Sequence, residues 1–252
     1  MDLGLKDKVA LITGAGSQIG FGKGIALTLA RAGCDIVAND IDQGGAEKTA
    51  AEVEALGRKS MAIKADVTKM AEVKDMVNAV IKKFGRIDIL VNNAGRTTMP
   101  RPFVETPEKD WEIVINLNIY GVFNCTKAVL PHMLERKSGR IINISSGAGF
   151  SGSPRFVAYG ASKAAIIAFT KGLSKEVASS GIRVNSIAPG IGDTNFLRTA
   201  NFPEGEMERA LKMIPSGRTT TPEDVGNMVA YLASDMANNI LGQTFLVDGG
   251  MS

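Results

Sequence analysis

The 252-residue sequence predicts an α/β fold: a single domain built on a doubly wound, seven-stranded parallel sheet with helices on both faces. Short apolar runs alternate with longer helical patterns, which is the order that βαβ units produce. The strand runs are apolar on both faces, as a sheet covered by helices on both sides requires. No linker, internal repeat or low-complexity tract divides the chain, so we expect one domain over residues 1–252.

The expected elements follow one another along the whole chain. The predicted strands are Val9–Thr13, Asp35–Asn39, Ser60–Ala65, Ile87–Asn92, Arg140–Ser145, Arg183–Ala188 and Thr244–Val247. The predicted helices lie near 22–32, 44–56, 69–84, 107–136, 157–180 and 222–234. With right-handed crossovers, this order gives a Rossmann-type sheet.

The segment from Gly190 to Arg218 breaks the alternation. It contains Pro203 and Gly205, scattered large apolar residues and no strand pattern. A long insert after a strand of such a sheet is often a lid over the site, so we expect a substrate lid at about 191–217. The alternative is a packed helical excursion that serves an oligomer contact.

Composition excludes several classes of protein. Apolar residues make up 44% and charged residues 22% of the chain, as in a soluble globular protein, and the net charge of +3 indicates no nucleic-acid or membrane partner. The N-terminus lacks a signal-peptide pattern, and no stretch approaches the roughly 20 apolar residues of a membrane span. We therefore expect a cytoplasmic protein. Cys34, Cys125 and His132 show no metal-ligand spacing, so no metal site is expected.

The first predicted strand runs directly into a glycine-rich stretch, TGAGSQIGFGKG. Glycines allow the backbone to approach a pyrophosphate closely, and the N-terminus of the following helix offers free N–H groups to it. The strand before and the helix after provide the context that this motif needs. We interpret the stretch as a phosphate-binding loop rather than a plain tight turn. The candidate glycines are Gly14, Gly16, Gly20, Gly22 and Gly24.

Polar and small residues follow the next three strands. Asp40 ends the second strand, where a carboxylate accepts the hydroxyls of an adenosine ribose and repels a 2′-phosphate, so NAD is expected rather than NADP. The alternative for Asp40 is an ordinary turn residue. Asp66 after the third strand either accepts from an adenine amino group or caps the next helix. Small residues at 92–95, NNAG, leave room for the adenosine half.

Tyr159 and Lys163 lie four residues apart at the start of a predicted helix, on one helix face. An ammonium beside a phenol favours the phenolate, so we expect Lys163 to lower the pKa of Tyr159 toward neutrality. Such a tyrosine exchanges a proton with an alcohol or a carbonyl. Taken alone, the pair is also typical of a solvated helix face.

These motifs together resemble the short-chain dehydrogenase/reductase family over essentially the whole chain. The matching pieces, in the family's order, are TGAGSQIGFG, Asp40, DV at 66–67, NNAG at 92–95, INLNIYGVF at 115–123, SS at 145–146, YGASK at 159–163, PGIGDT at 189–194 and VDGG at 247–250.

The resemblance implies a catalytic set. Tyr159 is the general acid/base, Ser146 polarises the substrate carbonyl, and Lys163 lowers the tyrosine pKa and holds the nicotinamide ribose. Asn118 supports a proton relay through water; Asn116 lies nearby, but the spacing to GVF at 121–123 fits Asn118 better. The implied cofactor contacts, with NAD as cofactor, are Gly14, Ser17, Gln18, Gly20, Phe21, Asp40, Ile41, Asp66, Val67, Asn93, Ala94, Gly95, Tyr159, Lys163, Pro189, Gly190 and Thr194.

Two departures from the family pattern stand out. Five residues separate Gly14 from Gly20, where three are usual, and this longer loop resembles that of the enoyl-carrier-protein reductase branch. The ordinary Tyr-x-x-x-Lys spacing does not match that branch, so only the loop is carried over. Gly192 stands where the family often has Val or Ile, in the segment whose main chain meets the nicotinamide carboxamide.

The substrate pocket is expected to be mostly apolar. The residues assigned to substrate are Phe150, Arg155, Phe156 and Phe196. Thr97, Met99 and further apolar lid residues complete the expected walls, which fit a hydrophobic secondary alcohol or ketone. Arg155 and Arg198 either meet an anionic group or are solvated surface residues.

The sequence therefore predicts an NAD(H)-dependent oxidoreductase that interconverts a secondary alcohol and a ketone. One alternative is a β-ketoacyl thioester reductase acting on carrier-protein or coenzyme A substrates, since Lys137 and Lys175 resemble a carrier-protein docking pair; those reductases usually take NADPH. An alternative of another class is a non-catalytic NAD-binding sensor. By family analogy we expect a homotetramer.

Overall fold

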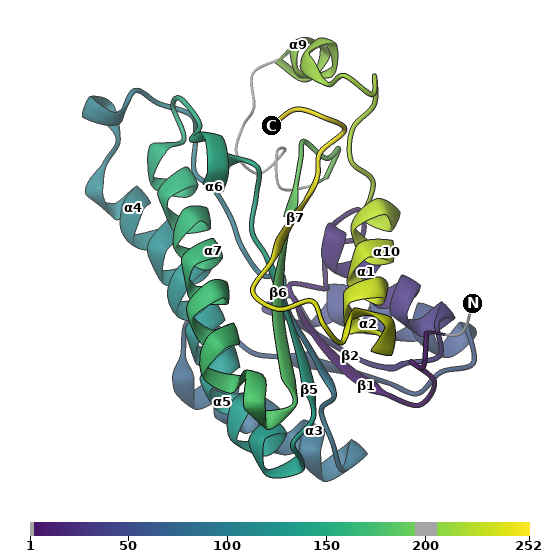
Figure 1. Ribbon diagram of the computed structural model, residues 1–252. Coiled ribbons are helices and arrows are strands. Elements are labelled where there is room, and N and C mark those ends of the chain that lie inside the picture. The colour runs from purple at the N-terminus through teal and green to yellow at the C-terminus, as the bar shows by residue number, and fades with distance from the viewer. Residues whose placement is uncertain (1–2, 195–205) are drawn as a thin grey trace.

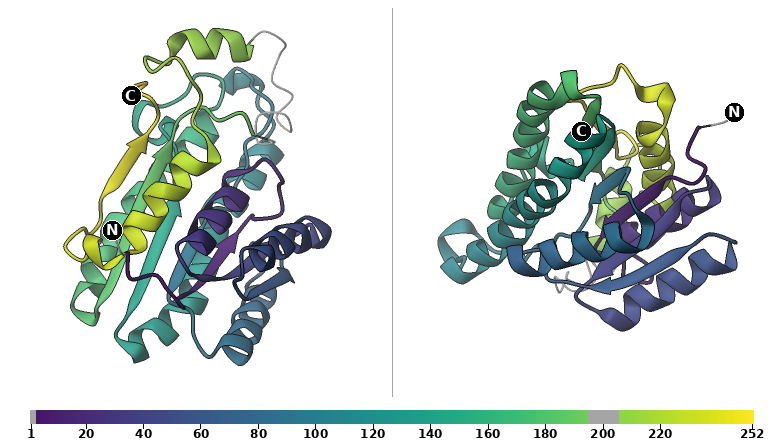
Figure 2. Two further views of the ribbon diagram at one scale, coloured as in Figure 1. Left: turned by 90° about the vertical axis from the view of Figure 1, so that its right-hand side faces the viewer. Right: turned by 90° about the horizontal axis from the view of Figure 1, so that it is seen from below.

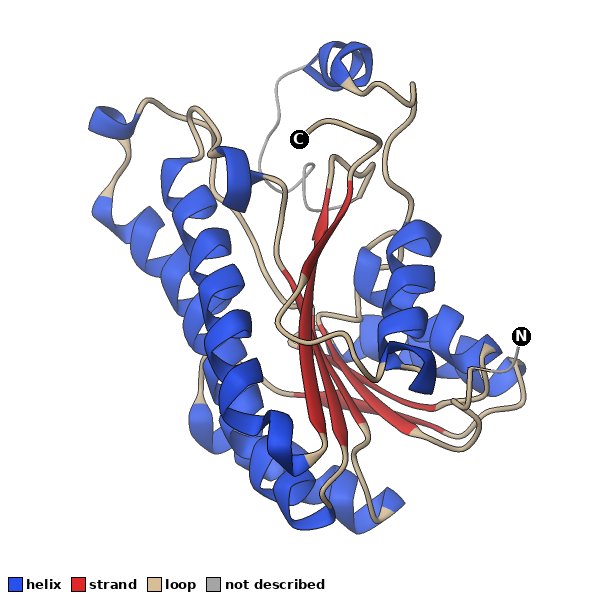
Figure 3. Cartoon of the chain, in the orientation of Figure 1, coloured by secondary structure: helices blue, strands red, loops and turns tan. Residues whose placement is uncertain are grey.

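The computed structural model of the protein describes residues 3–194 and 206–252, and Figures 1 and 3 show its arrangement. Its sheet has seven strands in the order β3-β2-β1-β4-β5-β6-β7, and all neighbouring strands are parallel. The predicted fold class is confirmed, and each strand lies within two residues of its expected bounds. The strands are β1 Val9–Thr13, β2 Asp35–Asp40, β3 Ser60–Lys64, β4 Ile89–Asn92, β5 Gly139–Ile144, β6 Ile182–Pro189 and β7 Thr244–Val247.

Helices connect the strands and cover both faces of the sheet, as the two further views in Figure 2 also show. The α-helices are α1 Phe21–Arg31, α2 Gln43–Ala55, α3 Met70–Phe84, α4 Glu108–Ile115, α5 Gly121–Arg136, α6 Ala148–Ser151, α7 Val157–Val177, α9 Glu206–Met213 and α10 Pro222–Ala233. Shorter helical turns are η1 Phe103–Glu105, η2 Asn116–Tyr120, η3 Ala178–Ser180 and η4 Asp235–Ala237.

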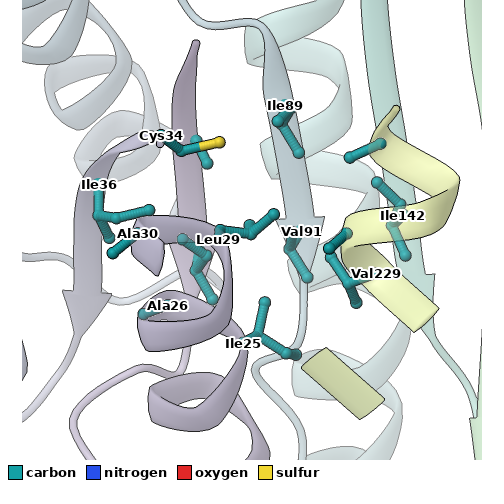
Figure 4. Packing of buried hydrophobic residues seen from close by; sticks show 14 of the residues in the cluster. Ile25, Ala26, Leu29, Ala30, Cys34, Ile36, Ile89, Val91, Ile142 and Val229 are labelled. Carbon is teal, nitrogen blue, oxygen red and sulfur yellow. The ribbon is translucent and has the colours of Figure 1, made fainter. Parts of the chain in front are cut away.

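Alternation along the strands divides the core into two layers. On β1, Ala10 and Ile12 face the cluster under α1, α2 and α10, whereas Val9 and Leu11 face the cluster under α3, α5 and α7. Figure 4 shows the first cluster, with side chains from α1 and α10 packed over the central strands. Strands that bury both faces explain the continuous apolar runs in the sequence.

The strand order reverses between β1 and β4. From β1 the chain builds outward through β2 and β3, and it then returns to the other side of β1 to begin β4. In open parallel sheets, ligands bind at the carboxyl ends of the strands beside such a reversal, because the connecting helices diverge there. The glycine stretch after β1 and the NNAG stretch after β4 meet at this point.

Several elements differ from the expectation. The predicted helix 107–136 is interrupted by η2, a π-helical turn. The sequence did not indicate this turn, because one wider turn hardly disturbs the apolar periodicity of the helices on either side. α6, α9 and the short turns η1 and η4 were not expected. Part of the predicted lid, residues 195–205, lies outside the described residues; of the rest, Glu206–Met213 form α9.

Among the residues that the structure describes, one helical stretch, Glu108–Arg136, is long and apolar enough by length and composition to cross a membrane. The core helix of a soluble protein passes the same test. Val122, Cys125, Val129 and Met133 of α5 are buried in the cluster on the sheet. We therefore interpret this stretch as a core helix.

Leu29 tests the packing of the first core cluster, since it is fully buried on α1 between the sheet and α10. We expect Leu29→Ala to lower the free energy of unfolding by about 2–5 kcal/mol, because the substitution leaves a cavity in a close-packed core. The matched control is Leu56→Ala at the end of α2, where 42% of the residue is exposed. Urea denaturation measures both; equal losses would contradict this packing.

Candidate active site

The predicted catalytic residues come together at the carboxyl ends of β4 and β5. Ser146 follows β5 directly, and Tyr159 and Lys163 lie on the first two turns of α7. The hydroxyls of Ser146 and Tyr159 are hydrogen-bonded to each other. The Ser146 oxygen also accepts a hydrogen bond from the Ala148 N–H at 3.2 Å, which orients that side chain. Two hydroxyls thus converge on one point, as donors to a single substrate oxygen would.

Lys163 lies beneath this hydroxyl pair and is only 5% exposed. Its Nζ donates to the carbonyl oxygen of Ile144 at 2.9 Å and lies 5.8 Å from the centre of the Tyr159 ring. Its own backbone carbonyl accepts from Ser145 Oγ at 2.8 Å. The end of β5 therefore holds the lysine from two sides.

The pKa values of this pair correct one sequence-based expectation. Removal from water raises the pKa of Tyr159 to about 12, against a smaller lowering effect of the Ser146 hydrogen bond. Burial lowers the pKa of Lys163 to about 8. The expectation that Lys163 brings the tyrosine pKa toward neutrality is wrong for this structure, because desolvation of the buried phenol is the largest effect on its pKa.

Asn118 is fully buried within the π turn η2. Its Oδ1 accepts from the Arg96 N–H at 2.9 Å, and its Nδ2 donates to Arg96 O at 2.9 Å and to Ser162 Oγ at 3.0 Å. Ser162 Oγ in turn donates to the Tyr159 carbonyl at 2.7 Å. Asn116 is exposed by contrast, so the geometry favours Asn118 as the residue that belongs to the site.

The glycine stretch after β1 forms a tight loop over the end of the sheet. Gly14 has φ +67°, and a Cβ there would lie 2.8 Å from Ala94 Cα. Gly20 is the N-cap of α1, which has no side-chain cap and no acidic residue in its first turn. The free N–H groups and the positive end of the helix dipole suit a pyrophosphate. Gln18 Nε2 braces the loop by donating to the carbonyls of Gly16 and Gly45 at 2.8 and 3.1 Å.

Asp40 lies beside this loop at the end of β2. Its carboxylate accepts from the N–H groups of Gly16 at 2.8 Å and Asp42 at 3.0 Å. Among the described residues it forms no ion pair, so the remaining lone pairs are available to ribose hydroxyls. Ile41 next to it is 66% exposed, which is an accessible apolar surface for an adenine ring. The residues present thus fit a dinucleotide.

The remaining predicted adenosine contacts are mostly tied into the fold. Asp66 Oδ1 accepts from the N–H and the hydroxyl of Thr68, at 3.0 and 2.7 Å, in a local turn. Asn93 Nδ2 donates to the carbonyls of Thr13 and Gly14. Ala94 N donates to Thr13 Oγ1, and Val67 is buried against Gly121. Gly95 lies close to Asn118 and Lys163, and Ser17 O accepts from Gly20 N.

The predicted nicotinamide segment follows β6. Pro189 ends this strand, and Gly190 N donates to Val247 O at 3.0 Å. Thr194 is 4% exposed and its N–H donates to Gly192 O at 2.9 Å. A side chain at Gly192 would meet the ring of Phe21.

Three of the four predicted substrate residues, Phe150, Arg155 and Phe156, lie between Ser146 and Tyr159 in the chain. Phe150 is 48% exposed on α6, and Phe156 is the N-cap of α7. Arg155 is exposed with φ +68°, and its carbonyl accepts from Arg101 N at 3.1 Å. Phe196 and Arg198 lie outside the described residues. These assignments remain predictions.

Comparison with known proteins identifies the lineage. A family model described as enoyl-(acyl carrier protein) reductase matches residues 14–252. A 3-oxoacyl-(acyl-carrier-protein) reductase of Thermotoga maritima is 42% identical over 247 residues, 98% of each chain, and one of Synechocystis sp. is 44% identical over 249 residues, also 98% of each. The chain belongs to the short-chain dehydrogenase/reductase family.

Solved structures of the short-chain dehydrogenase/reductase family agree. A 3-ketoacyl-(acyl-carrier-protein) reductase from Brucella melitensis complexed with NADH has a TM-score of 0.92 at 36% identity, covering 98% of this chain and 99% of that chain. NAD⁺-bound xylitol dehydrogenase has a TM-score of 0.92 at 33% identity, with the same coverage. The chain is thus an oxidoreductase of a family that binds a nicotinamide cofactor. Its relatives' names match the thioester-reductase alternative better than the simple alcohol reading.

Two features of this family member were not evident from its sequence. Ser162 links Asn118 to the backbone of Tyr159, and the Ile144 carbonyl fixes Lys163. The YGASK motif contained Ser162 as a signal, but a backbone carbonyl leaves none. The two lysines that resemble a carrier-protein docking pair lie away from the catalytic residues. Lys137 follows the end of α5, and Lys175 lies 16 residues beyond Tyr159, about 24 Å along α7.

Metal binding has no candidate site here. Within the described ranges, no group of three or more His, Cys, Asp or Glu side chains could hold a metal ion. The absence of a metal in catalysis remains a prediction.

Lys163 makes stability depend on pH. Its pKa is about 8 in the folded chain and 10.5 as the ordinary value, so between these values the unfolded chain binds more protons and the free energy of unfolding rises with pH. Below about pH 8 both states are protonated, and the folded state bears the full cost of a buried cation.

We expect Lys163→Met to remove this rise. The stability of the variant relative to the wild type should fall by roughly 2–3 kcal/mol between about pH 7 and pH 10.5. Urea denaturation across that range measures the difference, and Lys171→Met, an exposed lysine on the same helix, is the control. A pH-independent difference would show that Lys163 is not a buried titrating group.

Proposed function

We propose that this protein is an NAD(H)-dependent reductase of 3-oxoacyl thioesters, with Tyr159 as the general acid. The carrying observation is the pair of hydrogen-bonded hydroxyls of Ser146 and Tyr159 above the buried Lys163, at the carboxyl ends of the central strands. A bound nicotinamide would supply the hydride, which is the cofactor's own chemistry. The chain's part is to bind the carbonyl, orient it and deliver a proton.

The two hydroxyls act in two steps, first stabilising charge and then transferring a proton. The hydroxyls of Ser146 and Tyr159 donate hydrogen bonds to the carbonyl oxygen and stabilise the negative charge that develops on it. Tyr159 then gives its proton to that oxygen, and the carbonyl becomes a hydroxyl. A pKa of about 12 keeps the phenol protonated at neutral pH, which suits carbonyl reduction.

Lys163 and Asn118 support the return of the proton. With a pKa of about 8, Lys163 is mostly charged at neutral pH, and its ammonium stabilises the phenolate that forms beside it. We propose that Asn118, with both ends of its amide held by Arg96 and Ser162, positions water for reprotonation of Tyr159 through Lys163.

We propose NAD rather than NADP as the cofactor. Asp40 supports this choice, since its carboxylate borders the phosphate loop and would repel a 2′-phosphate. A relative from Brucella melitensis, named as a thioester reductase, is itself described in complex with NADH. The remaining cofactor contacts follow the predicted set, with Pro189, Gly190 and Thr194 at the nicotinamide end.

The relatives support the thioester substrate. Two relatives that are 42% and 44% identical, with 98% coverage, carry the name 3-oxoacyl-(acyl-carrier-protein) reductase. The second candidate is oxidation or reduction of a simple secondary alcohol or ketone, which the similarity to xylitol dehydrogenase favours. The third is a sensor that binds NAD without turnover.

One assay separates these functions. NADH consumption is followed with acetoacetyl-coenzyme A, an acetoacetyl carrier protein and simple ketones, and NADH formation with the matching alcohols. We expect the thioesters to have the highest kcat/KM. Faster turnover of simple ketones would replace the thioester proposal with the second candidate, and NADH binding without any turnover would favour the sensor.

Tyr159→Phe should lower kcat by about 10²–10⁴-fold, since it removes the proton donor and leaves the ring in place. NADH affinity should change by no more than roughly twofold, as most of the cofactor contacts remain. Steady-state kinetics and calorimetry measure the two quantities. Tyr231→Phe on α10 is the control. Substantial residual turnover would mean that another group is the acid.

Asp40→Ala combined with Ile41→Arg should shift the cofactor preference toward NADP. Loss of the carboxylate removes the repulsion, and an arginine binds a 2′-phosphate, so we expect the ratio of kcat/KM for NADPH over NADH to rise by at least about tenfold. Asp42→Ala with Ile41→Arg is the control, because Asp42 is a neighbouring exposed carboxylate. Unchanged selectivity would reject the ribose role of Asp40.

We also propose that the protein is a cytoplasmic homotetramer and that residues 191–217 form a lid over the substrate site. An apolar hollow on α5 and α7 supports a subunit contact there, since a contiguous exposed apolar patch often marks an interaction site. Its lining residues are Phe123, Thr126, Lys127, Leu130, Pro131, Leu134, Phe169 and Leu173. The mass in solution tests the oligomeric state.

A further inference from the structure

The ring of Phe21 occupies the space of a side chain at position 192. A Cβ built on Gly192 would lie 2.6 Å from Phe21 Cζ, 3.0 Å from Phe21 Cε1 and 3.0 Å from the Thr220 carbonyl oxygen. A Cβ at less than 3.0 Å from another heavy atom is not tolerated, so a side chain at 192 requires the Phe21 ring to move away. The Phe21 ring thus packs directly against Gly192, which lies 171 positions later in the chain.

The two residues belong to opposite parts of the cofactor-binding edge. Phe21 is the first residue of α1, directly after the phosphate loop, and its partly buried side chain packs on the core cluster beneath α1 and α10. Gly192 follows β6 in the predicted nicotinamide segment. The Phe21 ring therefore connects the phosphate loop after β1 with the segment after β6.

Hydrogen bonds hold the segment around Gly192 and the neighbouring Thr220. Thr220 N donates to Ile191 O at 2.8 Å, Thr194 N donates to Gly192 O at 2.9 Å, and Thr220 Oγ1 donates to Val247 O at 2.9 Å. At Gly192 itself no side chain restricts the main chain, and glycine has the widest conformational freedom of any residue. Among the described residues, the Phe21 ring is the nearest side chain to this position.

We propose that Phe21 is a positioning residue for the nicotinamide half of the cofactor, its ring packing against the 190–194 segment at Gly192, where the chain has no side chain of its own to restrict it. This inference rests on the proposed dinucleotide site. The adenosine half is held by separate residues around Asp40 and Ile41. Loss of the ring therefore weakens binding of the nicotinamide group selectively, whereas a merely structural role weakens binding of both halves.

The test compares NADH with ADP-ribose, which lacks only the nicotinamide. For Phe21→Ala we expect the Kd of NADH to rise about tenfold and the Kd of ADP-ribose to change by less than roughly twofold, by calorimetry. For Phe21→Leu, which retains more of the packing, the Kd of NADH should lie between those of the wild type and Phe21→Ala. Phe245→Ala, a partly buried aromatic on the same core cluster, is the control and should not separate the two ligands. Parallel losses for both ligands would overturn the inference.

A compensating pair provides a second readout that does not depend on loss of packing. Gly192→Ala alone should weaken NADH binding about tenfold, because the new methyl group collides with the ring. Adding Phe21→Leu to Gly192→Ala should restore most of that affinity. Failure of the double variant to recover, with a melting temperature like that of the wild type, would overturn the inference.

The outcomes also separate this inference from the proposed function. If NADPH binds more tightly than NADH, the same comparison uses NADPH and 2′-phospho-ADP-ribose, and the role of Phe21 is judged unchanged. Binding of a dinucleotide without thioester turnover would reject the proposed substrate but not the positioning role. A wild-type chain that binds neither dinucleotide would reject both.

Discussion

The site depends on one buried cation. The Lys163 ammonium has left bulk water, and the main-chain carbonyl at the end of β5 is the acceptor that compensates for part of that loss. This requirement fixes α7 against β5 and β6, and it places Tyr159 one helical turn earlier, next to Ser146. The same desolvation that makes the lysine reluctant to be charged keeps the phenol protonated. A site that holds its acid ready thus follows from the placement of a single side chain.

Most of the fold was predictable because both faces of the sheet are buried. A central strand such as Val9–Thr13, which is buried along its whole length, consists of the residue types that a covered strand requires, and its bounds agree with the structure. Asn118 and Ser146 were identified from motifs and lie beside Tyr159 and Lys163 as expected. Gly14 was predictable for a similar reason, since its backbone approaches the backbone of Ala94 closely and leaves no room for a side chain.

The rest could not be read from residue types. The π turn around Asn118 leaves the helical pattern on either side intact, and the acceptor of Lys163 is a carbonyl that every residue possesses. The pKa of Tyr159 was predicted in the wrong direction because adjacency in sequence indicates a neighbouring charge but not how far the chain removes both groups from water. The contact of the Phe21 ring with Gly192 involves two positions that only the folded chain brings together.

The strand order has a consequence for how the chain is made. Ala10 of β1 pairs with Ile89 of β4, 79 residues later, so the first strand leaves the ribosome long before its inner neighbour exists. During that interval β2 covers one side of β1 and the other side stays open, as a row of unpaired amides and carbonyls in an apolar strand. Such an edge recruits strands from other nascent chains. Placing the ligand site at the centre of the sheet therefore leaves the half-made protein vulnerable to aggregation.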